Sequence, residues 1–298
     1  MMYSSRYLIK EKIFGAVAVI VVSSLAALCI LPFIHIIALS LSSKSAIISG
    51  KVGLFPTAFT LEAYASIARN GSVLSSIVFT TLLTLVSTAL SMIFTICIAY
   101  PLSKNRFKGK TAILGLVVAT MYFSGGIIPE YILMKNLRLL DTFWVLVLPG
   151  LISAWNMIIL KSFFMAIPAS LEESAQIDGA SYVLVLRSVV LPLSMPVVAT
   201  LTLFYAVGRW NGFQDALIYI RTPSLYPIQL ILYQIFMSVS DAEIIREGAA
   251  LQQGQNEVLV AESVKAACII VATAPIVILY PLLQKHFISG VRLGAVKE

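Results

Sequence analysis

Long runs of apolar residues are the feature that most constrains the fold of this chain of 298 residues. A helix that crosses the hydrocarbon core of a bilayer needs about 20 apolar residues. Hydrophobic residues make up 59% of the chain and charged residues only 12%, whereas soluble domains carry about a quarter charged residues. This composition excludes an ordinary soluble enzyme and predicts an all-α, polytopic membrane protein.

Six apolar runs are candidates for membrane spans. Gly125, Gly126 and Pro149 fall in the third and fourth runs, so kinked or discontinuous helices are expected there. The first run is longer than the apolar core of a cleavable signal peptide, which has about 7–15 residues, so it should remain as a span. After an N-terminal tail of residues 1–12, one transmembrane domain is expected over residues 13–298, with spans at 13–41, 76–102, 112–133, 143–160, 195–220 and 264–283.

Basic residues gather in segments expected on one side of the membrane. The short loop between the second and third spans holds Lys104, Arg106, Lys108 and Lys110, and the first 12 residues hold three more basic residues. Because Lys and Arg near span ends accumulate on the cytoplasmic side, both termini are predicted to be cytoplasmic. The net charge of +7 is attributed to this orientation, and no nucleic-acid partner is expected.

No arrangement of residues predicts catalysis or a metal site. His35 and His286 lie near opposite ends of the chain, and the three cysteines lie in separate apolar runs, where burial is expected. Gly109-Lys110-Thr111 resembles the end of a phosphate-binding loop, but Lys104 stands where that motif has its first glycine. The chain is therefore expected not to be an enzyme and to bind no metal or nucleotide itself.

The segment 161–192, between the fourth and fifth spans, is predicted to be cytoplasmic and is too long for a simple turn. Ser170 and Glu173 fit a capping box at the start of a helix. Asp178-Gly179 fits its end, because glycine readily takes the left-handed backbone conformation of a C-terminal cap. A helix of only about two turns needs something to pack against, which favours a partner beneath the membrane.

The same segment contains an extended motif. Glu173-Ser174-Ala175 is followed after three residues by Gly179 and, nine residues later, by Val189-Val190-Leu191-Pro192. This pattern resembles the coupling motif of bacterial ABC importer permeases, Glu-Ala-Ala-x3-Gly-x9-Ile-x-Leu-Pro, with serine for the first alanine and valine for the isoleucine. Further stretches, at 124–129, 141–150, 177–181 and 208–211, resemble the carbohydrate-uptake branch of the maltose-permease second-subunit type. Similar permeases import oligosaccharides from complex, often acidic polysaccharides such as alginate or rhamnogalacturonan.

The resemblance implies partners and a mechanism in the bacterial inner membrane. A second, homologous permease subunit pairs with this type of chain, two copies of a cytoplasmic ATPase carry ATP and Mg²⁺, and an extracytoplasmic solute-binding protein delivers the oligosaccharide. The segment 170–181 is then the coupling helix, in which Glu173 faces basic residues of the ATPase. The residues assigned to coupling are Glu172, Glu173, Ser174, Ala175, Asp178, Gly179, Ala180, Leu191 and Pro192.

The predicted external stretch of residues 221–262 is acidic and begins with an apolar segment, Tyr226–Met237, expected to form a short interfacial helix. Its polar second half is either a solvated connector or a docking surface for the binding protein, because long loops are often functional. The docking residues would be Gly248, Gln252, Gln253, Gln255 and Asn256.

A sugar pathway is expected to combine aromatic rings with amides and hydroxyls, because sugars present hydroxyls and flat apolar faces. Interfacial or packing roles are the alternative for each nominated residue. The six runs hold almost no ionisable residues, which favours ATP coupling over an ion-coupled secondary carrier. That carrier, a permease for a different small solute and a membrane scaffold stay open as alternatives. The nominated pathway residues are Tyr122, Phe123, Trp155, Asn156, Trp210 and Asn211.

Overall fold

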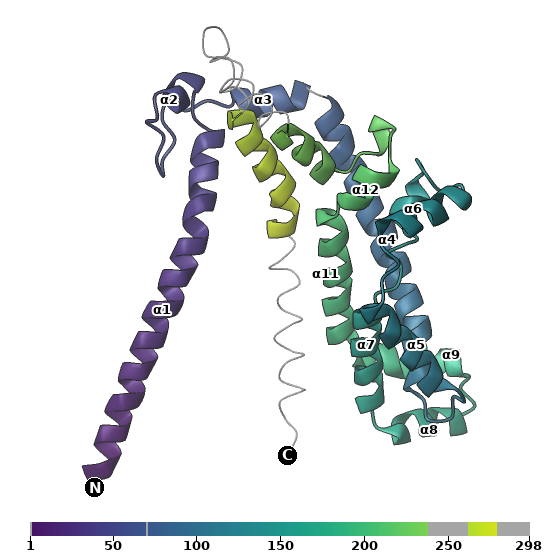
Figure 1. Ribbon diagram of the computed structural model, residues 1–298. Helices are drawn as coiled ribbons and strands as arrows, with labels where there is room; N and C mark the ends of the chain where they lie inside the picture. Colours follow the sequence, from purple (N-terminus) through teal and green to yellow (C-terminus); the bar gives the residue numbers. More distant parts are fainter. Residues whose placement is uncertain (1, 70, 238–261, 279–298) are drawn as a thin grey trace. The chain divides into compact units, whose positions relative to one another are not determined.

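The computed structural model describes residues 2–69, 71–237 and 262–278 (Figure 1). In these ranges the secondary structure is helical, and the β pairing is limited to one antiparallel bridge between Ser42 and Phe59. The predicted all-α class is therefore confirmed. The chain divides into two compact units, residues 1–71 with 232–272 and residues 72–231 with 273–298, which are described separately.

The first unit begins with one long helix, α1 (Met2–Ser40), which contains the first predicted span. In its apolar part, Ile13–Ser40, the most hydrophobic stretch is not buried by other parts of the chain. This is expected of a helix that faces lipid or another subunit. Two short helices follow, α2 (Lys44–Ile48) and α3 (Glu62–Arg69). Residues 262–278 form a further helix near the start of the sixth predicted span.

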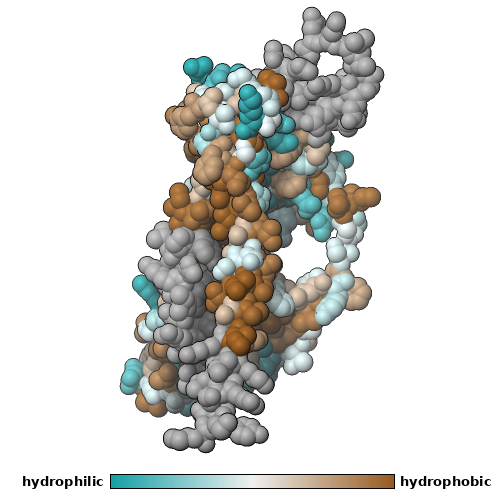
Figure 2. Space-filling model, turned by 90° about the vertical axis from the view of Figure 1, so that its left-hand side faces the viewer, coloured by the Kyte–Doolittle hydropathy of each residue, from teal (hydrophilic) through white to brown (hydrophobic). Residues whose placement is uncertain are grey.

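The second unit is built around α4 (Gly71–Ser103), a continuous helix that contains the second predicted span. The helix at Ile228–Met237, of which residues 232–237 belong to the first unit, agrees with the short helix expected there. Figure 2 shows hydrophobic residues over much of the visible surface, as expected of a membrane protein. The other elements are α5 (Lys110–Tyr122), α6 (Ile127–Asn136), η1 (Phe143–Leu146), α7 (Ala154–Ala166), α8 (Ala169–Ile177), α9 (Tyr182–Val185), η2 (Leu186–Val190), α10 (Leu191–Leu193), α11 (Met195–Asn211), α12 (Gln214–Tyr219) and η3 (Pro223–Leu225).

The predicted spans agree with the structure in part. Two helices, α1 and α4, are long and apolar enough to cross a bilayer, and up to five spans result within the described residues if each bent helix pair counts as one. The third predicted span is discontinuous, as expected: α5 and α6 meet at 116°. The break includes Gly126, which has φ of +84°. Residues 279–283 of the sixth predicted span lie outside the described residues.

The fourth predicted span is discontinuous, as expected from Pro149, whereas the fifth is interrupted where no break was predicted. In the fourth, η1 is followed by turns around Pro149 and Gly150, and the helix α7 begins only at Ala154 and continues to Ala166. In the fifth, Gly212 and Phe213 separate α11 from α12. Pro149 marks the break in the fourth run, whereas apolar composition alone does not reveal the break at Gly212 and Phe213 in the fifth.

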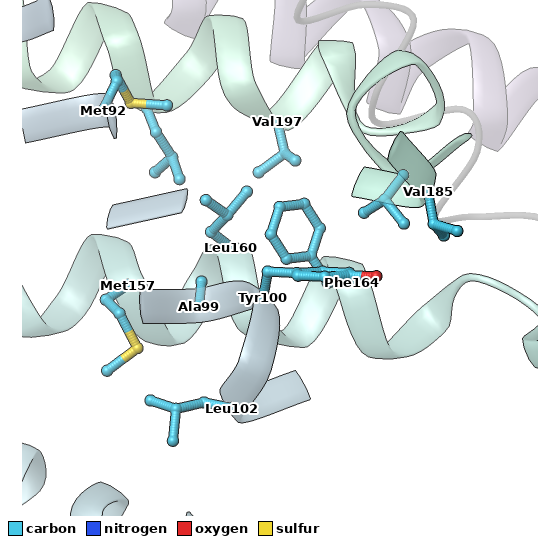
Figure 3. Close-up of a cluster of buried hydrophobic side chains, with 11 residues drawn as sticks. Met92, Ala99, Tyr100, Leu102, Met157, Leu160, Phe164, Val185 and Val197 are labelled. Carbon is cyan, nitrogen blue, oxygen red and sulfur yellow. The ribbon is translucent and has the colours of Figure 1, made fainter. Parts of the chain in front are cut away.

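One apolar core holds the second unit together (Figure 3). Tyr100 of α4 lies against Phe164 of α7, with ring centroids 6.2 Å apart in an edge-to-face arrangement, the geometry that aromatic pairs prefer. Leu160 is fully buried in the same cluster, and Val185 and Val197 extend it to α9 and α11. The core thus joins α4 to the helices on both sides of the segment predicted to couple to an ATPase.

The expectation of buried cysteines is confirmed for one residue. Cys268 is buried, whereas Cys29 and Cys97 are exposed on the outer faces of apolar helices. An apolar run cannot distinguish a side chain that packs in the protein from one that faces hydrocarbon, since both environments favour the same residues.

Candidate functional site

The helix α8 occupies the segment in which the coupling motif begins. It starts one residue earlier than predicted, at Ala169, directly after Pro168. The proposed capping box is wrong: Pro168 holds the N-cap position, no side chain caps the helix, and Ser170 lies in the first turn. Proline fixes its own φ near the value seen here, −58°, so it can lead directly into a helix without a polar cap.

The end of α8 agrees with the prediction. Gly179 has φ of +86°; its N–H donates to the carbonyl of Gln176 at 3.0 Å, and the N–H of Ala180 donates to the carbonyl of Ala175 at 2.9 Å. These two bonds are those of a Schellman motif, in which a left-handed residue satisfies the last carbonyls of a helix. Glycine takes this conformation without the steric cost that a Cβ brings.

The second half of the motif enters a π-helical turn, η2, immediately before Leu191-Pro192. Proline has no N–H for the carbonyl four residues earlier, and its ring crowds that carbonyl, here that of Ser188. The wider turn relieves this conflict. Val189 and Leu191 pack against the apolar core, so the motif residues after Gly179 connect α8 to the body of the second unit.

Glu172 is the buried residue of α8, with 7% of its surface exposed, and it forms an ion pair with Lys104. Lys104 directly follows α4, 68 positions away in the sequence. Its Nζ also lies 4.6 Å from the ring centroid of Tyr100, a cation–π distance. In contrast, Glu173 is exposed. This pair was not predicted, because nothing in the sequence relates the two loops.

A cavity of about 560 Å³ lies in the second unit and collects two of the nominated pathway residues, Asn156 and Asn211. Hydroxyl groups of Ser87, Ser91 and Tyr205 line it as well. Ser87 is 7% exposed, and its hydroxyl has no hydrogen-bond partner among the described residues. The cavity is therefore a polar space within a largely apolar helix bundle, suited to a ligand rich in hydroxyls.

Arg209 forms one corner of this cavity. Its guanidinium group binds the carboxylate of Asp215 through two hydrogen bonds, of 2.5 and 3.0 Å, and donates to the carbonyl of Leu146 at 2.7 Å. A bidentate pair of this kind fixes geometry as well as charge. It holds the break between α11 and α12 against η1. Gly212 packs closely here, because a Cβ at this position would lie 3.0 Å from Arg209 Nη2.

Asp141 fastens two loops of the second unit. Its carboxylate accepts hydrogen bonds from the N–H groups of Arg221 and Thr222, both at 2.9 Å, and from the Thr222 hydroxyl at 2.6 Å. Its own N–H donates to the carbonyl of Tyr219 at 2.9 Å. The Thr222 hydroxyl, followed by the two N–H groups, lowers the pKa of the Asp141 carboxyl below its ordinary value of 3.8.

The structure does not bring all nominated pathway residues together. Tyr122 and Phe123 are each 80% exposed at the end of α5, and Trp155 is also exposed, whereas Trp210 is buried in the second unit. None of these four aromatic residues lines the polar cavity. The five residues nominated for docking, Gly248, Gln252, Gln253, Gln255 and Asn256, lie outside the described residues.

Apolar helices of membrane-spanning length, bent helix pairs and a cavity with polar lining residues are features expected of the membrane component of a transporter. The chain belongs to the family described as "Binding-protein-dependent transport system inner membrane component", which matches residues 13–293. It is thus an ABC importer permease of the inner membrane, a transport subunit of the sugar and oligosaccharide type.

Relatives and a solved structure agree with this membership. The chain is 42% identical over 272 residues to the "Polygalacturonan/rhamnogalacturonan transport system permease protein YtcP" of Bacillus subtilis (strain 168), covering 91% of this chain and 94% of the relative. It is 42% identical over 286 residues to "Protein LplC" of the same organism, covering 96% and 95%. A bacterial ABC transporter "involved in the import of the acidic polysaccharide alginate" contains a chain with a TM-score of 0.83 at 30% identity, covering 93% of this chain and 98% of that one. The fold is therefore that of a type I ABC importer permease.

Proposed function

We propose that this chain carries an acidic oligosaccharide into the cytoplasm, driven by ATP hydrolysis on partner subunits. The observation that carries the proposal is the motif from Glu173 to Pro192, which lies on α8, its Schellman turn and η2 in a chain of this family. Six spans and cytoplasmic termini, as predicted from the sequence, are part of the proposal.

In the proposal α8 is the coupling helix. Glu173 is exposed and free to meet a cation of the ATPase, while Ile177, 86% exposed, offers an apolar contact to the same partner. Exposed apolar side chains on a short polar helix are typical of a protein interface. The rigid turn at Gly179 and the packing of Ala180 against the core would make displacement of α8 move the rest of the unit.

Two observations support an acidic sugar as the substrate. A relative at 42% identity is named for polygalacturonan and rhamnogalacturonan transport, and the solved transporter for import of alginate; these polymers contain uronic acids. The polar cavity supplies hydroxyls, the amides of Asn156 and Asn211, and Arg209 at its edge.

The proposed assembly contains a second, homologous permease subunit, two copies of a cytoplasmic ATPase that bind ATP and Mg²⁺, and a solute-binding protein. The dependence on a binding protein is part of the family's description. Docking of that protein is assigned to the stretch that contains Gln252, Gln253 and Gln255. The chain itself contributes the pathway and the contact with the ATPase.

Stimulation of ATP hydrolysis by defined sugars tests the substrate class. The complex, reconstituted with its binding protein, is assayed with oligogalacturonides, their methyl esters and neutral malto-oligosaccharides. We expect the free acids to stimulate hydrolysis and the methyl esters to lose most of the effect, because esterification removes the carboxylate alone. Equal stimulation by acids and neutral sugars would contradict the acidic-substrate assignment.

A further inference from the structure

The ion pair between Lys104 and Glu172 connects two elements that the coupling motif does not. Glu172 belongs to the first turn of α8, and Lys104 is the first residue after α4. The carboxylate side chain is 9% exposed and the ammonium side chain 26%. A charge this deeply buried needs its partner, because an uncompensated buried charge is strongly unfavourable.

The pair is also the contact that anchors the first turn of α8. The first turn of α8 has no side-chain cap, and the one residue of this helix that is buried is the charged Glu172. Leu171 and Ile177 are exposed. Apolar packing onto the core begins only with Ala175 and Ala180, toward the end of the helix. Within α8 itself, the first turn is therefore held by the ion pair, whereas Ile167, two residues before the helix, packs on the core.

On the other side of the pair, Lys104 is tied to a rigid element. Its ammonium group lies over the ring of Tyr100, which packs edge-to-face on Phe164 in the buried core. From there α4 runs without a break to Ser91 and Ser87, which line the polar cavity. The twelve helical steps from Ser91 to Ser103 correspond to about 18 Å of helix, so a displacement of Lys104 along α4 would be felt at the cavity wall.

We propose that Lys104 is a positioning residue that passes the movement of α8 to α4 through Glu172, and so couples ATP hydrolysis to rearrangement of the polar cavity. This rests on the proposed function of α8. The direct charge link acts alongside the chain connection through η2 and α11. The ion pair acts on the α4 side of the cavity and the chain connection acts on the α11 side. Movement of α8 would therefore displace both sides of the cavity.

The test measures sugar molecules imported per ATP hydrolysed by the complete complex in proteoliposomes. Glu172→Gln and Lys104→Met remove the attraction with little change in volume, and the exchange Lys104→Glu with Glu172→Lys restores it in reverse. Lys108→Met is the matched control, because Lys108 is exposed in the same loop. ATPase activity and subunit stoichiometry are recorded for each protein.

We expect each single variant to hydrolyse ATP while its sugar-to-ATP ratio falls at least about fivefold, the lower end of usual coupling between sites. The control and the charge exchange should stay within about twofold of the unsubstituted complex. A purely structural pair would instead lower assembly and leave the ratio of the assembled complexes unchanged.

The inference is overturned if the single variants keep the ratio, or if the charge exchange fails to assemble or assembles with a collapsed ratio. If a single variant does not assemble, the sugar-to-ATP ratio of the charge-exchange variant tests the inference in its place. Failure of the proposed function looks different, because the unsubstituted complex would then show no ATP-dependent uptake at all.

Discussion

Two ion pairs in the second unit are built on opposite principles. Arg209 and Asp215 are six residues apart in sequence and share two parallel hydrogen bonds, with a third from the arginine to the carbonyl of Leu146. Lys104 and Glu172 are 68 residues apart and meet through one ammonium group. Arginine's planar fork fixes an angle, whereas lysine is a point charge on a flexible stem. The first pair fixes the geometry within one short segment, and the second joins two elements that are far apart in the sequence.

The comparison predicts that the corner contributes to stability. Arg209→Ala leaves the Asp215 carboxylate without its partner at the break between α11 and α12. We expect the complex to lose about 3 kcal/mol of unfolding free energy. The midpoint of thermal unfolding in detergent measures this. Arg221→Ala is the matched control, since Arg221 is exposed and contributes its backbone N–H to the contact with Asp141. Equal losses of stability in the two variants would contradict a stabilising role for the Arg209–Asp215 pair.

The turn after α8 gives the next largest expected effect. At Gly179, with φ of +86°, a Cβ would meet no atom within 4 Å, so Gly179→Ala is strained by its conformation and not by contact. We expect a loss of about 1–2 kcal/mol and weaker binding of the ATPase. Gly179→Asn should lose less, because asparagine tolerates the left-handed region. Binding measured by co-purification checks both, and identical behaviour of the alanine and asparagine variants would argue against conformational strain.

A smaller effect is expected where the corner is packed most closely. In Gly212→Ala the new Cβ would lie 3.0 Å from Arg209 Nη2 and 3.4 Å from the carbonyl oxygen of Gly208. The guanidinium group must shift, at a cost of about 1 kcal/mol. Gly208→Ala has open space at its Cβ and serves as the control in the same thermal assay. Because Gly208 lies inside α11, where alanine favours the helix over glycine, Gly208→Ala should not destabilise; an equal loss in both variants would contradict the account based on close packing at Gly212.

The smallest effect concerns the hydrogen bonds that the Asp141 carboxylate accepts from Arg221 and Thr222. Its pKa is lower in the folded protein, so its contribution to stability is complete above the ordinary value of 3.8 and is lost as pH falls through the lowered pKa. Hydrogen exchange at the amides of Arg221 and Thr222, corrected for intrinsic rates, should show protection at neutral pH that fades only below about pH 4.

Asp141→Asn tests the same hydrogen bonds without a pH change. The substitution removes the charge while keeping a residue that accepts the φ of +57° found here. We expect it to lower protection at the two amides at neutral pH. Unchanged protection would mean that the carboxylate does not hold the loop.

Much of the coupling segment could be predicted from the sequence because its features are local. The short helix, its end at Asp178-Gly179 and the break in the third span follow from residues a few positions apart. The capping box failed because Pro168 starts the helix without a polar cap. The pairing of Lys104 with Glu172 was missed, because a contact across 68 positions depends on how the helices pack and leaves no signature in one sequence.

The pathway shows the same limit. Residue type selected six candidates, and packing brought only Asn156 and Asn211 to the polar cavity. Ser87 and Ser91 were not among these candidates, yet both line the cavity. Whether a polar group on a span packs or faces a cavity depends on its rotation about the helix axis relative to neighbours, which hydropathy does not contain.

The central claim is that this permease moves an oligosaccharide at the expense of ATP on another chain. Proteoliposomes that contain the full complex, with oligogalacturonide and binding protein outside and ATP inside, test it directly. The account predicts uptake that requires ATP and the binding protein and that Glu173→Lys largely abolishes. Uptake that persists without the ATPase subunits and follows an ion gradient would contradict it.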